Sequence, residues 1–595
     1  MTTTDTESTS DKDALPTIVL GTKPNATDSG DPGPLDHLTA ARRAALEAVL
    51  PRYLQSQRWF GGKARGVERV VVDDWGKLPG GCGAIWTVLD VRFADSGSHR
   101  YLLPLTISTG DAAQRIYERS RSCAVAFVGS GGGERALLHD ALACDDVCAA
   151  LLNAIGNEQT TATEHGEIWG LATEVFADLR GDANRPPPAP HLGPATSSNS
   201  LVFYGKRMLL KLFRRSTEGV NPDFEIGRFL TERGEFRRVP RMAGALEYHR
   251  DGEEPTTLAI VQETMTHRGD GWEHALDVLG RYYERVEARP EGLEVPQADR
   301  RSLVELSELS PPPLAREAIG GYLHVATILG RQTAELHTAL AGDFVDPAFA
   351  PEPLGPDDIE HLRLEVVRQE EQALAQLGST MDDLDGPTRD AARKLVNDET
   401  GDEARLGGEI QNLPADTGRS PQAGDSAIEA VKIRCHGDYH LGQVLWSGHD
   451  FLILDFEGEP TRSAAERKAK QSPLKDVAGM LRSYHYAAYA ALFTFTQERR
   501  DASADFAALE PWAELWRQWV SAAFLSAYRR TMRGRGIVPD DSAAFAELLD
   551  AFMLEKVFYE LSYELNNRPT WVRIPLRGIL DLTTEREVAG TEVRP

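Results

Sequence analysis

The sequence predicts an α+β protein with a β-rich N-terminal half and a mostly helical C-terminal half. Strand-like apolar runs recur between residues 70 and 265, whereas patterns with the helical period dominate after Trp272. The chain of 595 residues also exceeds the usual size of one hydrophobic core, so we expect two or three packed units.

Composition excludes several classes of function. The chain has 65 basic and 91 acidic residues, a formal net charge of −26, and no Lys/Arg-rich block, which argues against a nucleic-acid partner. The five cysteines are few and odd in number, which predicts no disulfide framework and a reducing compartment. No apolar segment approaches the roughly 18 residues that span a bilayer, and residues 1–33 lack the pattern of a signal peptide. We therefore expect a cytoplasmic protein without membrane contact.

The N-terminal region predicts a tail followed by a small α+β domain. Residues 1–36 are rich in Thr, Ser, Asp, Gly and Pro, a composition typical of a disordered tail. An apolar pattern with helical period then runs from Leu38 to Leu54. A further helix is predicted at 136–155. The intervening strand-like runs lie at 70–72, 84–91 and 101–107.

Lys211 stands out in the second strand-rich region, within a predicted hairpin of strands 201–204 and 208–213. A lysine inside an apolar strand is costly unless its charge is paired or reaches water along the strand. We expect Glu225 to be the partner, on a helix that Pro222 and Asp223 begin. With a polar turn before it and this acidic helix after it, Lys211 is predicted to contact phosphates.

The pattern most informative about chemistry combines a loop at 435–443 with the end of an apolar run at 451–454. Asp438 lies in the loop, Gln443 follows five residues later, and Asp455 ends the run. Phosphoryl transfer requires a group that orients the attacking hydroxyl and ligands for Mg²⁺. Each residue alone is common in turns and helix caps, but their order and spacing together predict a phosphotransferase.

The C-terminal half is predicted to be helical around this loop. A short strand at 430–434 precedes the loop, and Pro473 marks a helix start after it. A segment rich in Gly, Asp, Pro and Ser at 398–425 predicts an exposed loop. The other expected helices are 321–336, 359–377, 512–532 and 543–566.

With these motifs in place, the chain resembles the aminoglycoside-phosphotransferase-like branch of the protein-kinase-like superfamily, and within it the maltokinase family. The resemblance covers most of residues 40–580. It is carried by residues 57–63, 210–215, 219–223, 269–272, 436–443, 455–460, 470–477 and 559–569. Gln443 stands where the wider superfamily usually has Asn, an exchange that suits a neutral oxygen ligand on a longer arm.

The resemblance implies a two-lobed kinase that uses ATP and Mg²⁺ to phosphorylate maltose at its anomeric hydroxyl. The product, maltose 1-phosphate, would feed α-glucan (glycogen) synthesis from trehalose-derived maltose, with a trehalose synthase as a candidate partner. The expected boundaries are a disordered tail at 1–36, an N-terminal cap subdomain at 37–160, a kinase N-lobe at 161–268 and a C-lobe at 269–595.

The resemblance also assigns roles to individual residues. Asp438 would be the catalytic base, and Gln443 and Asp455 would hold Mg²⁺. Acceptor-binding residues are expected to be His440, Lys556, Tyr559 and Tyr563; the last three share one helical face, which equally suits a packed core. The expected nucleotide contacts are Ser197, Asn199, Lys211, Glu225, Gln262 and Met265.

Two alternatives stay open at this stage. A glucosamine or other aminosugar kinase would need an additional carboxylate near the acceptor, which Glu457 or Glu459 could supply. A pseudokinase that acts as a scaffold for trehalose-metabolising enzymes would not need Lys211, Asp438 and Asp455 together with an amide ligand. The complete set therefore favours an enzyme.

Overall fold

The structure is a computed structural model that forms two compact units. The first unit comprises residues 1–232 and 240–265, and the second comprises 233–239 and 266–595. The described residues are 15–20, 35–80, 83–129, 136–182, 188–194, 196, 198–288, 295–398, 429–460, 462–497 and 502–592.

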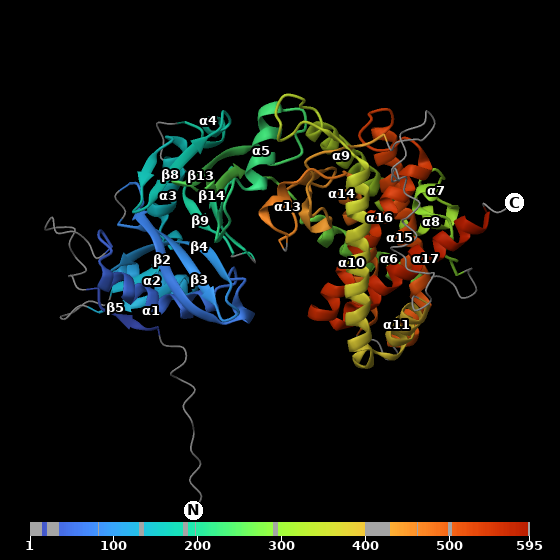
Figure 1. The fold of residues 1–595 in the computed structure, drawn as a ribbon, viewed down its shortest axis with the longest axis horizontal. Helices are drawn as coiled ribbons and strands as arrows, with labels where there is room; N and C mark the ends of the chain where they lie inside the picture. Colours follow the sequence, from blue (N-terminus) through green and yellow to red (C-terminus); the bar gives the residue numbers. More distant parts are fainter. Residues whose placement is uncertain are drawn as a thin grey trace, which may run out of the picture. The chain divides into compact units, whose positions relative to one another are not determined.

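The first unit begins with a seven-stranded sheet on which one long helix packs (Figure 1). Helix α1, Ala40–Ser56, buries Leu46, Leu50 and Leu54 against the sheet, because apolar residues at this spacing share one helical face. The strand order is β1-β5-β6-β4-β3-β2, with β12 paired to β4. The strands are β1 Thr17–Ile18, β2 Val67–Lys77, β3 Ile85–Phe93, β4 Ser98–Ser108, β5 Ala124–Val128, β6 Ala136–Asp140 and β12 Arg215–Ser216.

A second seven-stranded sheet in the same unit is antiparallel throughout, in the order β7-β8-β13-β14-β11-β10-β9. The predicted hairpin is present, with Tyr204 opposite Met208 and the turn between them. The strands are β7 Thr160–Ala162, β8 Gly166–Ala172, β9 Pro190–Leu192, β10 Asn199–Tyr204, β11 Met208–Phe213, β13 Met242–Arg250 and β14 Thr256–Glu263. The remaining helices of the unit are α2 Gly110–Arg119, α3 Asp145–Gly156, α4 Phe176–Arg180 and α5 Pro222–Arg233.

Helix α3 joins the two sheets into one core. Its apolar residues Leu151 and Ile155 pack with Trp86 of the first sheet and Leu210 of the second. The helix predicted over residues 136–155 was therefore wrong in its first part: residues 136–140 form the buried strand β6, which pairs with β4 and β5. A short run of apolar residues cannot be assigned to strand or helix by periodicity alone.

Part of the segment expected to be a disordered tail is placed in the first sheet. Thr17 and Ile18 pair in parallel with Phe127 and Val128 of β5. Ile18 is buried in the core between the sheet and α1, which stabilises this short edge strand.

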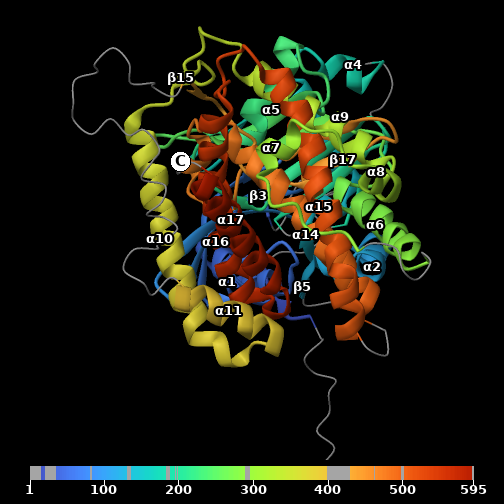
Figure 2. The same cartoon turned by 90° about the vertical axis from the view of Figure 1, so that its right-hand side faces the viewer.

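The second unit is mostly helical. Helices α14, α15 and α16 run through its centre, α9 packs on α15, and α10 lies alongside α16 (Figure 2). The helices are α6 Gly271–Glu287, α7 Leu303–Ser307, α8 Pro313–Ile319, α9 Tyr322–Leu340, α10 Pro356–Thr380, α11 Gly386–Asp398, α13 Ala464–Lys468, α14 Leu474–Thr496, α15 Ala502–Met532, α16 Ser542–Asn567 and α17 Arg573–Glu592.

Two small two-stranded sheets interrupt the helices of the second unit. Strands β15, Glu352–Pro353, and β16, Val431–Lys432, pair before the predicted catalytic loop. Strands β17, Val444–Trp446, and β18, Phe451–Ile453, pair after it. The loop predicted at 398–425 lies, apart from Asp398, outside the described residues.

The fold class is thus the expected one: a curled β-sheet lobe with an N-terminal cap, followed by a helical part. Four cysteines of the described part carry no disulfide, and Cys82 lies outside it. Within the described residues, no helix combines the length and the apolar character that a membrane span needs.

Candidate active site

Asp476, in the first turn of α14, fixes the loop that carries Asp438. Its two carboxylate oxygens accept hydrogen bonds from the backbone N–H of His436 at 2.8 Å and of Gly437 at 2.9 Å. Asp476 is only 1% exposed, and a buried carboxylate is tolerated where hydrogen bonds and cations compensate for lost water. The loop backbone is therefore tied directly to the helix below it.

Glycines allow the loop and its neighbours to approach closely. Gly437 has φ +81° and lies so near Gly458 that a Cβ at 437 would be 3.1 Å from the Gly458 Cα. A Cβ at Gly479 of α14 would lie 2.6 Å from the carbonyl oxygen of Tyr439, closer than real Cβ atoms approach. Only glycine fits these positions without moving the backbone.

Side chains of the loop anchor it on three further sides. The Tyr439 hydroxyl lies 2.9 Å from Thr333 Oγ1 of α9, and His436 Nε2 lies 2.9 Å from the Leu454 carbonyl oxygen. The Ser483 hydroxyl of α14 accepts from the Leu441 N–H at 3.0 Å. The loop is thereby held rigidly while Asp438 itself remains partly exposed, at 21% of its side chain.

Gln443 and Asp455 lie at the same end of the β17–β18 hairpin. Val444 pairs with Ile453, and the Leu454 N–H donates to the Gln443 carbonyl oxygen at 3.1 Å. Asp455, with φ +63°, adopts the left-handed backbone conformation that residues other than Gly rarely occupy. Such strain concentrates at functional sites, and carboxylate and amide oxygens are ligand types that suit Mg²⁺.

In the first unit, Lys211 forms a buried ion pair with Asp223, whereas the sequence predicted Glu225 as its partner. The Lys211 ammonium donates to Asp223 Oδ2 at 3.0 Å, and both side chains are buried. Sequence analysis treated Asp223 only as a helix-start residue. Glu225 lies half-buried two residues further along α5, in the same first turn, and its pairing with Lys211 stays a prediction.

The other predicted nucleotide contacts lie around the same strands. Asn199 begins β10 opposite Phe213 of β11, and Gln262 pairs with Leu209. Met265 is the last residue of the first unit. Ser197 lies outside the described residues.

A cavity of about 590 Å³ in the second unit brings the predicted acceptor residues together with Asp438. It is lined by Asp438 and by all four predicted acceptor residues, His440, Lys556, Tyr559 and Tyr563. Not predicted from the sequence were the aromatic residues from distant segments and two carboxylates, Glu560 and Glu564, whereas Glu459 was considered there only as a partner for an amine-bearing acceptor. These additional lining residues are Trp272, Tyr486, Trp571, Arg568, Glu459, Glu560 and Glu564.

Aromatic rings form one side of this cavity. The rings of Tyr559 and Tyr563, one helical turn apart on α16, are stacked at 6.5 Å between centroids. Arg568 lies 4.6 Å from the Trp571 ring centroid and 5.5 Å from that of Tyr563. Tyr563 is 44% exposed although it is a large aromatic residue, and it lines the cavity.

Each of the three further carboxylates has a cation of its own. Glu459 forms an ion pair with Lys556. Glu560 accepts from Arg482 Nε at 2.8 Å. The same type of pair forms between Glu564 and Arg568, at 2.7 Å.

These pairs determine the charge states around Asp438. Burial alone would lower the pKa of Lys556, but Glu459 and Asp438 raise it above its ordinary value, so the ammonium stays charged. Burial would raise the pKa of Glu459, and Lys556 lowers it below its ordinary value instead. Burial lowers the pKa of His440, against the opposing effect of Asp438, so its ring is neutral near pH 7. Its Nε2 lies 3.8 Å from Asp438 Oδ2.

Comparison with known proteins agrees with this architecture. Residues 53–143 match the family model of the maltokinase N-terminal cap domain. A glucosamine kinase of Streptacidiphilus jiangxiensis is 26% identical over 357 residues, covering 60% of this chain and 64% of the relative. A glucosamine kinase of Mycolicibacterium smegmatis is 25% identical over 444 residues, covering 73% of this chain and 88% of the relative. The chain thus spans less than two thirds of the length of the first relative.

Solved structures show the same fold over almost the whole chain. A glucosamine kinase in complex with glucosamine, ADP and inorganic phosphate aligns with a TM-score of 0.53 at 21% identity, over 86% of this chain and 93% of that one. A second glucosamine kinase crystal form aligns with a TM-score of 0.55 at 20% identity, over 91% and 99% of the two chains. The fold of cap, sheet and helices is therefore similar to that of these kinases.

Proposed function

We propose that this chain, a member of the maltokinase-like kinase family, is a sugar kinase that transfers the γ-phosphate of ATP to the anomeric hydroxyl of maltose. The observation that carries the proposal is the position of Asp438 on the wall of a cavity whose other carboxylates are already paired with cations. The cap-domain match supports the maltokinase assignment.

Asp438 has the environment that a general base needs. Its loop is held by Asp476, its side chain is partly exposed, and it lines the acceptor cavity. In the proposed reaction, Asp438 accepts the proton of the attacking hydroxyl, and that oxygen then forms the bond to phosphorus while ADP leaves. Lys556 contributes positive charge beside Asp438.

The residues at the end of the β17–β18 hairpin fit a magnesium ion. Gln443 offers an amide oxygen and Asp455 a carboxylate, the ligand types that Mg²⁺ prefers. When bound, Mg²⁺ would neutralise phosphate charge during transfer. In the first unit, Lys211, oriented by Asp223, is proposed to contact the phosphates of ATP.

The cavity suits a neutral disaccharide. Its volume of about 590 Å³ falls in the range of about 300–1,000 Å³ that small-molecule sites occupy, which leaves room beyond one sugar ring. The stacked rings of Tyr559 and Tyr563 offer a flat apolar surface for the C–H face of a sugar. An uncharged acceptor needs no free carboxylate, and it leaves the three ion pairs intact.

Glucosamine is the second candidate acceptor, because both relatives compared above carry that name. Of the two carboxylates considered for an amine, Glu459 lines the cavity and is paired with Lys556. The ammonium group of glucosamine would have to displace Lys556 from Glu459. This cost favours maltose over glucosamine.

A coupled assay of ADP release with maltose, glucose, glucosamine and trehalose tests the proposal. We expect the highest kcat/KM with maltose, and the product to feed α-glucan synthesis with maltose supplied by a trehalose synthase. Activity confined to glucosamine would replace the maltose assignment, and activity with none of these sugars would refute the proposed function.

A further inference from the structure

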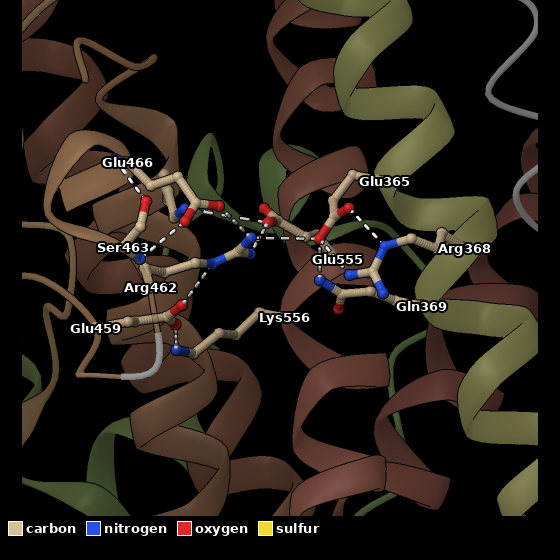
Figure 3. Close-up of polar contacts among 10 residues, drawn as sticks. Glu365, Arg368, Gln369, Glu459, Arg462, Ser463, Glu466, Glu555 and Lys556 are labelled. Carbon is tan, nitrogen blue, oxygen red and sulfur yellow. Dashed lines mark hydrogen bonds and ion pairs between the residues drawn. The ribbon is translucent and has the colours of Figure 1, made fainter. Parts of the chain in front are cut away.

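The guanidinium of Arg462 contacts carboxylates from three separate parts of the second unit (Figure 3). Its own segment supplies Glu459 and Glu466, α10 supplies Glu365, and α16 supplies Glu555. The guanidinium nitrogens lie 3.4 Å from Glu459 Oε2, 3.5 Å from Glu466 Oε1, 3.3 Å from Glu365 Oε1 and 3.0 Å from Glu555 Oε1.

The arrangement depends on the geometry of arginine. A planar guanidinium presents five N–H donors in fixed directions, so one side chain can serve several carboxylates at once. Arg462 is 24% exposed, so these contacts are only partly screened by water. Without this cation, the four carboxylates would repel one another more strongly. Glu459 and Glu466 would lose their shared link to Glu365 of α10, and the Glu459–Lys556 pair would remain as a link to α16.

Arg462 is connected to both members of the ion pair that lines the acceptor cavity. Glu459 faces Arg462 with Oε2 and Lys556 with Oε1. Lys556 directly follows Glu555 on α16, and Glu555 accepts from Arg462 Nη2 at 3.0 Å. Arg462 therefore fixes Glu459 directly and the helical turn of Lys556 through Glu555, as Figure 3 shows.

We propose that Arg462 is a positioning residue for the sugar acceptor. Arg462 does not line the acceptor cavity. It holds Glu459 and Lys556 in their positions within that cavity, and therefore determines where the positive charge of Lys556 lies relative to Asp438. The inference rests on the proposed function, because it assigns the Glu459–Lys556 pair to acceptor binding.

Arg462→Met tests this role, because methionine removes the charge while retaining an unbranched side chain. We expect KM for the acceptor to rise about tenfold, with KM for ATP changed less than about twofold. Arg462→Lys restores one positive charge but not the planar set of guanidinium donors. Its KM for the acceptor should therefore lie between those of the wild type and Arg462→Met.

Arg368→Met is the matched control. Arg368 also binds Glu365, at 2.7 Å, but it is 57% exposed, and among the described residues it forms no hydrogen bond or ion pair with Glu459 or Glu555. Its kinetic constants should equal those of the wild type. Equal losses in Arg368→Met and Arg462→Met would contradict the proposal, as would an unchanged acceptor KM in Arg462→Met.

A purely structural role predicts a different result: loss of thermal stability, with kcat and both KM values altered together and no recovery in Arg462→Lys. Hydrogen exchange on the protein without substrates separates this inference from the proposed function. Amides at 462–468 should exchange faster in Arg462→Met than in the wild type, with α9 unchanged. Unchanged exchange at 462–468 would refute the positioning role even if no sugar proved to be a substrate.

Discussion

Asp476 Oδ2 lies 3.2 Å from Nε2 of His337, and the same oxygen accepts a hydrogen bond from the His436 N–H in the loop of Asp438. His337 in turn contacts the Tyr528 hydroxyl through Nδ1 at 3.0 Å. A chain of polar contacts thus runs from α15 through α9 and α14 to the loop of Asp438. All these groups are buried, so each contact is made in surroundings of low polarity, where its loss is costly.

Asp476→Asn should destabilise the second unit and reduce activity. Asparagine retains one acceptor oxygen but places an N–H₂ group against a backbone donor, which we expect to lower the free energy of unfolding by about 2–3 kcal/mol. Thermal unfolding followed with kcat measures both effects. Wild-type stability with normal kcat would show that the anchor is dispensable.

The pKa of Asp476 predicts that the stability of the protein depends on pH in the acid range. Burial would raise the pKa of Asp476, but His337, His436 and the Gly437 N–H together lower it below the ordinary value of 3.8. A carboxyl with a lowered pKa in the folded state stabilises the protein above pH 3.8 and loses that contribution as the pH falls through the lower value. Acid unfolding below pH 3.8 should therefore be less steep in Asp476→Asn than in the wild type, and identical slopes would contradict the account.

Asp438→Asn should reduce kcat by about a hundredfold or more, with KM for ATP nearly unchanged. Asparagine keeps the size of the side chain but cannot accept the proton of the attacking hydroxyl. Steady-state kinetics with maltose and ATP provides the measurement. Turnover near the wild-type rate would mean that another group is the base.

Lys211→Met should destabilise the first unit, because it leaves the buried Asp223 without that cation. We expect a loss of about 3–5 kcal/mol in unfolding free energy, together with a raised KM for ATP. Lys206→Met, in the exposed turn of the same hairpin, is the matched control and should behave as the wild type. Equal stability of the two variants would exclude a structural role for the Lys211 ion pair.

Asp455→Asn should raise the Mg²⁺ concentration needed for half-maximal activity by about tenfold. Asparagine tolerates the left-handed backbone at φ +63°, so the change removes charge while preserving the turn. A titration of activity with Mg²⁺ provides the test. An unchanged requirement would remove Asp455 from the metal site.

Tyr563→Ala should raise KM for maltose about fivefold and leave KM for glucose almost unaltered. Tyr563 is the exposed member of the stacked pair, so it is expected to contact the second ring of a disaccharide only. Comparison of both sugars in one variant serves as its own control. An equal rise in KM for both sugars would mean that Tyr563 contacts the first sugar ring.

The fold and the loop of Asp438 were predictable because their signals are local. Periodicity gave the long helices and the hairpin of Lys211, and the order of Asp438 and Asp455 along the chain indicated the chemistry. Residues 136–140 were assigned wrongly, since a short apolar run fits a strand or a helix equally well. Pro473 marked a helix start, which does not show that the carboxylate of Asp476 in the same helix holds a loop 40 residues away in sequence.

The cavity beside Asp438 was only partly predictable. Lys556, Tyr559 and Tyr563 share one helical face, which sequence alone could not assign to a core or to a pocket. The role of Arg462 depends on Glu365 and Glu555, which lie 97 and 93 residues away. No sequence spacing reveals such a junction, because it exists only after α10 and α16 have packed.

The position of the phosphate on the product tests the central claim most directly. Phosphorus and proton NMR of the product formed from maltose, ATP and Mg²⁺ should show a phosphate coupled to the anomeric proton of the reducing-end ring, and no such product with Asp438→Asn. A phosphate on any other carbon, or phosphorylation of glucosamine with maltose left unchanged, would contradict the account.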